Sequence, residues 1–165
     1  MLDVRVYGDP VLRKRGAVVT VFDDKLRLLV KEMIETMVEE DGVGLAAPQV
    51  GESLQLAVID ATGGEKPPIV LINPEFTYHS EETATNEEGC LSLPGITLKV
   101  TRPVFVSVKA QDEFGNVFNI ENADGLLARA LQHETDHLNG LMIVDHVSPL
   151  QRKMLSGKLK KMAER

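Results

Sequence analysis

The stretch LQHETDHLNG constrains the fold more than any other part of the chain, because it places two histidines on one face of a helix. His133 and His137 are four residues apart, so both imidazoles can reach one metal ion. Leu126 and Ala130 precede them at helical spacing, and the histidines continue this apolar stripe. The pattern therefore predicts an inward-facing helix over 123–138, around which the rest of the chain packs.

Glu134 completes an H-E-x-x-H pattern between the two histidines. We expect its carboxylate to flank the metal, where it can bind a metal-bound water instead of the metal itself. From the chain's own His and Glu counts, about 0.009 occurrences are expected by chance, so a coincidental match is rare. The alternative is a pair of surface histidines on a helix.

A catalytic site of this kind normally has three protein ligands, and the pattern supplies only two. A metzincin would place a third histidine where this chain has Ile143. Asp145 and His146 are reserve candidates, although they lie past Gly140, where the helix is expected to stop. Use of either residue would favour an H-E-x-x-H endopeptidase.

A better third ligand lies upstream in the stretch EGCLS, where Cys90 is the only thiol and Gly89 lets another backbone or a ligand come close. A metal would lower the pKa of this thiol and hold it as thiolate. The alternative for Cys90 alone is a buried, inert thiol. Beside an H-E-x-x-H pattern that lacks a ligand, the metal interpretation is favoured.

The glycine-rich stretch GVGLAAPQVG contains one polar side chain, Gln49, which can donate its amide hydrogen to a developing oxyanion. The alternative is a packed loop in which Gly44 and Gly51 adopt unusual backbone conformations.

The order of elements predicts an α+β fold, because strands cluster in the middle and helices lie near the ends and the metal motif. We expect one domain over residues 1–165, with mixed or antiparallel sheets around the central helix that carries H-E-x-x-H. An acidic exposed loop is expected over 78–88, and a hairpin turn over 112–116. The remaining expected elements are helices over 23–40, 123–138 and from 148 onward, and strands over 4–7, 54–60, 69–73, 96–100, 104–108 and 117–120.

The net charge of −7 is unevenly distributed. Residues 148–165, expected to form a basic C-terminal helix, contain six basic residues and one acidic residue, which gives +5 and leaves −12 on the rest of the chain. Such a tail is either a solvated helix or a contact for a polyanion. No apolar run approaches the roughly 18 residues of a membrane span, and no signal-peptide core is evident. The single cysteine allows no internal disulfide. Together these observations lead us to expect a cytoplasmic protein.

Three motifs stand in order along the chain: G-V-G-L-A-A-P-Q, E-G-C-L-S and Q-H-E-T-D-H. Together they closely resemble peptide deformylase, and the likeness covers nearly the whole chain, including G-D-P-V-L-R at its start. The resemblance implies a metal-dependent hydrolase that removes the formyl group from N-terminal formylmethionine of new polypeptides and releases formate. Besides a deformylase and an H-E-x-x-H endopeptidase, a metal-stabilised binding module without catalysis is the third alternative.

The resemblance implies roles for individual residues. Cys90, His133 and His137 would ligate the metal with a water completing a tetrahedral site, and Glu134 would act as general base and acid. The metal would usually be Fe²⁺, which Zn²⁺, Ni²⁺ or Co²⁺ can replace. Gln49 and the backbone N–H of Leu91 would stabilise the tetrahedral intermediate, and Gly44 would hydrogen-bond the substrate backbone. The residues expected to bind substrate are Val43, Gly44, Glu88, Gly89, Leu126 and Ala130, with His133 beside the methionine pocket.

The same resemblance implies nascent formylmethionyl peptides as partners, a monomer, and contact of the basic tail with the ribosome. Asp136 is expected either to pair with Arg102 behind the metal or to face solvent. Two features depart from the family pattern. Residues 94–97 lack an arginine that many bacterial members have. Arg129 stands where many members have an apolar residue, and we expect it to lie at the pocket rim with its charged head in water.

Overall fold

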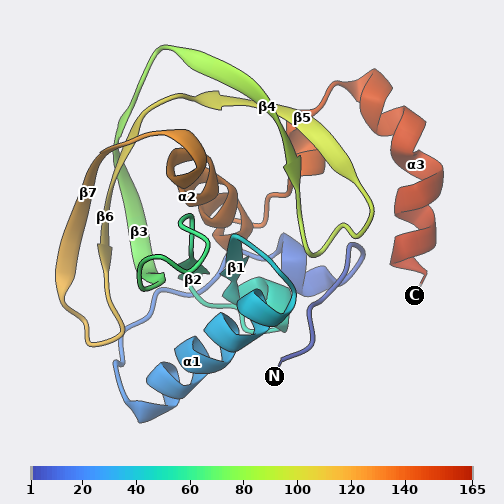
Figure 1. Cartoon of the computed structure of the whole chain (residues 1–165). Helices are drawn as coiled ribbons and strands as arrows, with labels where there is room; N and C mark the ends of the chain where they lie inside the picture. The colour runs from blue at the N-terminus through green and yellow to red at the C-terminus, as the bar shows by residue number, and fades with distance from the viewer. Residues whose placement is uncertain (1, 165) are drawn as a thin grey trace.

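In the computed structural model, which describes residues 2–164, helix α2 (Gly125–Leu138) is surrounded by strands from two antiparallel sheets (Figure 1). The larger sheet has five strands in the order β1-β2-β3-β6-β7, and the smaller one pairs β4 with β5. This arrangement confirms the predicted α+β class. The strands are β1 (Gly44–Ala46), β2 (Leu56–Ile59), β3 (Ile69–His79), β4 (Thr83–Gly89), β5 (Thr97–Pro103), β6 (Val106–Gln111) and β7 (Val117–Ala123).

Strand β2 shows how the core is divided. All four of its side chains are buried, which is the pattern of a strand covered on both faces. Ala57 and Ile59 join the hydrophobic cluster around α2. Leu56 and Val58 point the other way, into a second cluster formed with helix α1 (Asp24–Glu39). The large sheet thus separates α2 from α1, and α2 lies on the side that faces β4 and β5.

The helices begin where capping chemistry predicts. The Asp23 carboxylate accepts a hydrogen bond from the backbone N–H of Leu26 at 3.0 Å, and the Ser148 hydroxyl accepts one from Gln151 at 3.1 Å. Ser148 begins helix α3 (Pro149–Ala163), which lies outside the sheets at the edge of the molecule (Figure 1). Leu159 anchors this helix in a third hydrophobic cluster under β5. No helix within residues 2–164 is long and apolar enough to cross a membrane.

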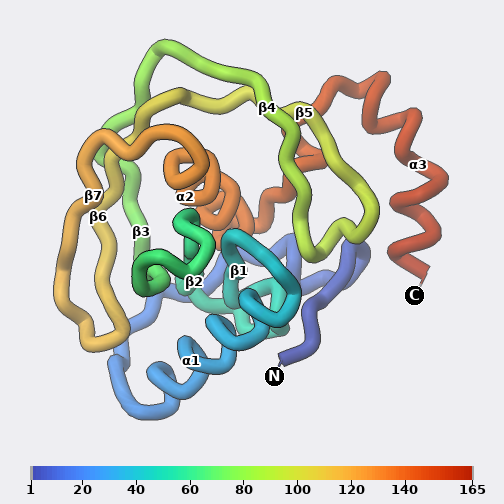
Figure 2. Tube along the Cα trace, viewed as in Figure 1, coloured from blue at the N-terminus to red at the C-terminus, as the bar shows by residue number. Residues whose placement is uncertain are grey.

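The predicted exposed loop over 78–88 is wrong. Strand β3 continues to its end at residue 79, and the chain turns over 80–82 directly into β4, as the trace in Figure 2 shows. Most β4 side chains are polar and exposed, so the strand has no alternation of apolar and polar residues to reveal it. Its backbone is instead fixed by seven-residue pairing with β5.

Three smaller corrections concern the chain near the site. Residues 4–7 form no strand, although the Arg5 and Tyr7 N–H groups donate to the carbonyls of Gln49 at 2.6 Å and Ser92 at 2.9 Å. This extended segment therefore joins the two motif loops. The glycine-rich stretch contains β1 and a short 3-10 helix, Ala47–Val50, instead of being all loop. Helix α2 begins at residue 125, because 123 still pairs with β6.

Candidate metal centre and active site

Three potential metal ligands converge between the small sheet and α2. Cys90 Sγ lies 3.3 Å from His137 Nε2, and His137 Nε2 lies 3.3 Å from His133 Nε2. All three ligand atoms are within 4.8 Å of one another. Tetrahedral coordination with bonds of about 2.0–2.3 Å requires ligand atoms roughly 3.3–3.7 Å apart, so the spacing fits a single ion. The structure thus brings together the three residues expected to bind metal.

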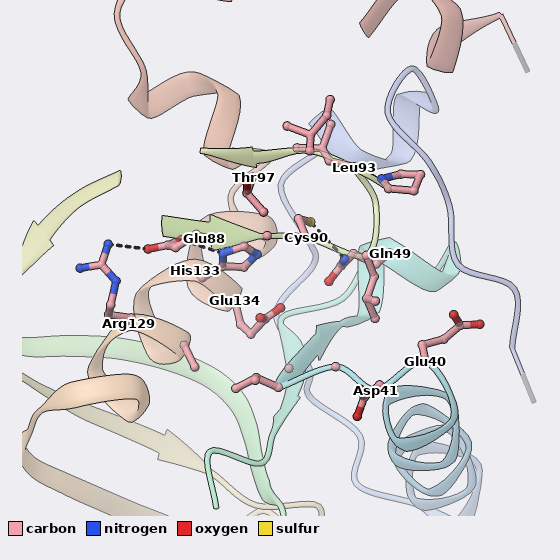
Figure 3. A pocket seen from close by; sticks show the side chains of 18 of the residues that line it. Glu40, Asp41, Gln49, Glu88, Cys90, Leu93, Thr97, Arg129, His133 and Glu134 are labelled. Atoms are coloured by element: carbon pink, nitrogen blue, oxygen red, sulfur yellow. Dashed lines mark hydrogen bonds and ion pairs between the residues drawn. The ribbon is translucent and has the colours of Figure 1, made fainter. Parts of the chain in front are cut away.

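The elements explain this convergence. Cys90 directly follows the last residue of β4, and the two histidines lie on successive turns of α2. Figure 3 shows Cys90 and His133 beside each other. His137 is almost fully buried. The reserve candidates lie elsewhere: Asp145 pairs with Arg13 at 2.6 Å, and His146 contacts Asp136 at 2.7 Å. Neither belongs to the cluster of three.

The electrostatic surroundings act in opposite directions on the two histidines. Burial lowers the pKa of His137 well below its ordinary value, with help from the nearby charge of His133, so its Nε2 is free to ligate. Burial would also lower the pKa of His133, but the negative charge of Glu134 and the contacts of Cys90 and Glu88 raise it well above the ordinary value. The same negative groups would stabilise a metal cation.

Glu134 projects from α2 into the cavity beside these ligands (Figure 3). It is only 4% exposed, and burial raises the pKa of its carboxyl to about 7. Its Oε1 has no hydrogen-bond partner among residues 2–164. A carboxylate in this state can accept a proton from a water in the cavity and donate it again.

Gly44 is required by space and not by an unusual backbone angle. A Cβ atom on Gly44 would lie 2.5 Å from Glu134 Oε2, so any side chain here would displace the carboxylate from its position. Gly51 does have a left-handed conformation, with φ of 87°. The alternative interpretation of this stretch was therefore right for Gly51 and wrong for Gly44.

Gln49 is fixed at both ends of its amide. Its Oε1 accepts from the Ala46 N–H at 2.9 Å, and its Nε2 donates to the Ser92 hydroxyl at 3.1 Å. The same nitrogen donates its second hydrogen to Cys90 Sγ at 3.7 Å, and Figure 3 shows the amide beside the thiol. This long hydrogen bond directs the second hydrogen to the point next to Cys90, where a bound oxygen could accept it instead of the sulfur.

A cavity of about 700 Å³ is lined by Cys90, His133 and Glu134. The residues expected to contact substrate all line it, although they come from three separate elements, β1, β4 and α2, and from the loop before β1. Leu126 lies at its exposed edge, whereas Ala130, one turn further along α2, is buried. The sequence-predicted lining residues present are Val43, Gly44, Gln49, Glu88, Gly89, Leu91, Leu126, Ala130, His133 and Glu134.

Glu88 does more than line the cavity, and the sequence did not reveal this. Its Oε1 accepts from His133 Nδ1 at 3.0 Å, while Arg102 binds both carboxylate oxygens at 2.7 and 2.9 Å. Burial would raise the pKa of Glu88, but the hydrogen bonds from His133 and Arg102 bring it to about 2. Metal-binding histidines commonly have such a carboxylate partner, and this rule was the available signal. Arg102 also binds Asp136 at 2.9 Å, the pairing that was one of two expectations for Asp136.

The expectation that Arg129 holds its charged head in water is wrong. Its side chain is only 13% exposed, and its guanidinium lies 2.8 Å from Glu88 Oε2. The buried carboxylate, together with backbone carbonyls of β4 and β5, draws the side chain inward.

Comparisons with known proteins agree with this geometry. The family described as polypeptide deformylase matches residues 1–153. A peptide deformylase of Thermotoga maritima is 48% identical over 96% of this chain and 94% of its own length, and one of Cellvibrio japonicus is 45% identical over 98% and 95%. The crystal structure of a Legionella pneumophila peptide deformylase has a TM-score of 0.92 at 46% identity, covering 98% of this chain and 94% of that one. A Synechococcus elongatus peptide deformylase in complex with actinonin has a TM-score of 0.89 at 45% identity, over 95% and 87%.

Proposed function

This chain belongs to the polypeptide deformylase family, whose members remove the N-terminal formyl group from nascent polypeptides, and we propose that Cys90, His133, His137 and Glu134 carry out this reaction here. The observation that carries the proposal is the convergence of a thiol and two imidazoles beside a buried carboxylate. Hydrolysis adds water across the formyl C–N bond, so the products are formate and a free amino group.

Cys90 and the Nε2 atoms of His133 and His137 are the proposed ligands of a divalent cation. When bound there, such a cation lowers the pKa of a coordinated water and polarises a carbonyl oxygen. Fe²⁺ is the proposed physiological metal, with Zn²⁺, Ni²⁺ or Co²⁺ able to replace it, and this preference is supported by family resemblance. A thiolate with two imidazoles suits several of these ions.

Glu134 is the proposed general base and acid. Glu134 lines the cavity and its Oε1 has no hydrogen-bond partner among residues 2–164, so the carboxylate can take a proton from the attacking water and deliver it to the departing amine nitrogen. The second oxygen lies against β1, where the missing side chain of Gly44 leaves room for it. This packing limits the orientations of the carboxylate and holds it ready for transfer.

Gln49 and the backbone N–H of Leu91 are the proposed donors to the oxyanion that develops on the formyl group. Fixed donors stabilise this charge because they need little reorganisation during the reaction, and one donor is typically worth roughly 3–4 kcal/mol. The Gln49 amide is supported for this role by its hydrogen bonds with Ala46 and Ser92, which hold it beside Cys90.

The substrate backbone is proposed to bind between the edges of β1 and β4. Each of these strands has a single strand neighbour, and Gly44 of β1 and Gly89 of β4 both line the cavity. An extended peptide can add to such an edge through main-chain hydrogen bonds. The methionine side chain would enter beside Val43, Leu126 and Ala130.

The direct test is formate release from a formylmethionyl peptide. Protein loaded with Fe²⁺ or Ni²⁺ without oxygen should release one formate per peptide, and the matching acetylated peptide should release no acetate. Metal-loaded protein that releases no formate would contradict the proposal. A Cys90→Ser variant that keeps its metal while Asp145→Ala loses it would point to a different ligand set and to an endopeptidase.

We further propose one catalytic domain over residues 1–165 that acts as a cytoplasmic monomer and approaches the ribosome through α3. Exposed basic residues on this helix supply the charge for contact with RNA phosphates: Arg152, Lys153, Lys158, Lys160 and Lys161. Binding of this kind weakens with added salt. Replacing Lys153, Lys160 and Lys161 by glutamate should weaken co-sedimentation with ribosomes without disturbing the Leu159 anchor. If the variant sediments with ribosomes as much as the parent does, and added salt does not change the amount, the proposed contact is contradicted.

A further inference from the structure

Arg129 makes contacts that the proposed chemistry does not use. We propose that Arg129 is a positioning residue, which fastens the β4–β5 hairpin to α2 and thereby holds Cys90 at ligating distance from the two histidines. The inference rests on the proposed function for the assignment of the three ligands. It adds a residue that touches neither the metal nor the substrate's reacting atoms and acts through Glu88 and the hairpin backbone.

The guanidinium of Arg129 binds three groups on the hairpin. One terminal nitrogen donates to the Ala84 carbonyl of β4 at 3.2 Å. The other donates to the Val100 carbonyl of β5 and lies 2.8 Å from Glu88 Oε2 (Figure 3). A single side chain of α2 therefore holds both strands of the hairpin and the carboxylate that orients His133.

Such a fastening is needed because the ligands belong to different elements. Cys90 follows the end of β4, whereas the histidines are part of α2. The hairpin has only two strands. Leu98 and Val100 of β5 pack into the third hydrophobic cluster, but most β4 side chains are exposed, so the strand that leads to Cys90 has little packing of its own to fix its position. Arg102 supplies a second connection by reaching Asp136 on α2 from β5. The distance between Cys90 Sγ and the histidine Nε2 atoms therefore depends on both Arg102 and Arg129.

The shape of the guanidinium is as important as its charge. Its planar fork can address several acceptors at once, whereas a lysine ammonium would act as a point charge on one of them. The sign of the charge provides a further distinction. Removing a positive charge near the ligands would by itself favour a dication, because like charges repel. If Arg129 acts by position, its removal must have the opposite effect and weaken metal retention.

The experiment compares Arg129→Met, Arg129→Lys and a control, Arg27→Met. Arg27 lies on α1, pairs with Asp24 at 2.7 Å and does not line the cavity. Each protein is loaded with one equivalent of Zn²⁺, and its transfer to an excess of chelator is followed without substrate. Loss of partners behind a ligand commonly costs 10–100-fold in metal affinity, so we expect Arg129→Met to release zinc about 10-fold faster than the parent. Arg129→Lys should release zinc at a rate between those of Arg129→Met and the parent, and Arg27→Met should release it at the parent's rate.

Cobalt provides a spectroscopic readout that a general loss of stability would not change. The visible absorption of Co²⁺ depends on the geometry of its ligands, so folded Arg129→Met loaded with Co²⁺ should have an altered spectrum, and Arg27→Met an unaltered one. If Arg129→Met does not fold, Arg129→Lys must still release zinc faster than the parent.

Zinc release that is unchanged or slower in the Arg129 variants would overturn the inference. It would also be overturned if zinc release were unchanged and only the KM for formylmethionyl peptides rose, because Arg129 would then be a wall of the methionine pocket. Since zinc transfer is measured without a peptide, its outcome is independent of whether the protein releases formate. Failure of the proposed function and failure of this inference are therefore distinguishable.

Discussion

Glu88 and Asp145 are each held by two arginines, and the two carboxylates differ mainly in burial. The side chains around Glu88 are 4–13% exposed, whereas those around Asp145 are 21–43% exposed. The arginines are Arg102 and Arg129 for the first carboxylate, and Arg13 and Arg152 for the second. The same chemical groups therefore act in a low-dielectric interior in one place and next to water in the other.

The two clusters also hold different parts of the molecule. Glu88 connects β4 and β5 to α2 and contacts a proposed metal ligand, His133. Asp145 joins the 3-10 helices Pro10–Arg13 and Ile143–His146 to α3, and it also accepts from the backbone of Met142 at 2.8 Å. The comparison indicates that burial makes an ion-pair cluster able to fix a site, whereas a solvated cluster only fastens surface elements.

Removal of Arg102 should give the largest effect on folding stability. Arg102→Met leaves Glu88 and Asp136 with fewer partners in a buried setting, and breaking a buried pair typically costs about 3–5 kcal/mol. Urea unfolding of the metal-free protein measures this loss. A cost below about 1 kcal/mol would remove the distinction between the two clusters.

Neutralising Glu88 sharpens the comparison at the metal. Glu88→Gln keeps the shape of the side chain but removes the charge that His133 Nδ1 and both arginines contact. We expect zinc affinity to fall about 10–100-fold, the range typical of groups that orient a metal-binding histidine. Competition with a chromophoric chelator measures the affinity. Asp145→Asn is the matched control and should leave it unchanged; equal losses in the two variants would contradict this interpretation.

Arg13→Met should have a small effect that depends on salt. Its pair with Asp145 is partly solvated, and such pairs are typically worth about 0–1 kcal/mol. Because exposed charges are screened, the difference from the parent should shrink further in 1 M salt. A loss of stability as large as that of Arg102→Met would show that burial is not what separates the clusters.

The smallest effect is the pH dependence contributed by Asp145. Burial would raise its pKa, but the Met142 N–H and Arg13 lower it below the ordinary value of 3.8. A carboxyl whose pKa is lowered by folding stabilises the protein above its unfolded pKa, and this contribution is lost as the pH falls through the folded value. The stability gap between the parent and Asp145→Asn should thus be constant above about pH 5 and close at more acidic pH. A gap that widens on acidification would contradict the assignment.

The sequence predicted those parts of the molecule that depend on local patterns. The start of α1 was expected from a cap at Asp23 or Asp24, and the structure uses Asp23, while the start of α3 follows from the cap at Ser148. The H-E-x-x-H pattern on an apolar stripe indicated the inward-facing histidines. The search for a third ligand led to Cys90, which the structure places next to them. The helix starts and the histidine pair were predicted from neighbouring residues, whereas Cys90 was identified because the histidine motif lacked a third ligand.

The sequence did not predict features that arise from pairing between distant segments. Strand β4 was missed because its side chains are polar on both faces, and only pairing with β5 defines it. The inward position of Arg129 depends on Glu88, which lies 41 residues away in the sequence (129 − 88), and on carbonyls exposed by the hairpin. Long side chains at a pocket edge can turn either way, and the local sequence does not decide between water and a buried partner.

The central claim is that a buried carboxylate beside a Cys–His–His metal centre carries out deformylation, and one paired measurement tests it most directly. Formate release from a formylmethionyl peptide is compared between the parent and Glu134→Gln, both loaded with Ni²⁺ and shown by elemental analysis to hold equal metal. Since general acid–base catalysis typically contributes about 10²–10⁴-fold, the variant should lose at least 100-fold in kcat while its metal content is unchanged. Equal kcat values for the two proteins at equal metal content would contradict the account.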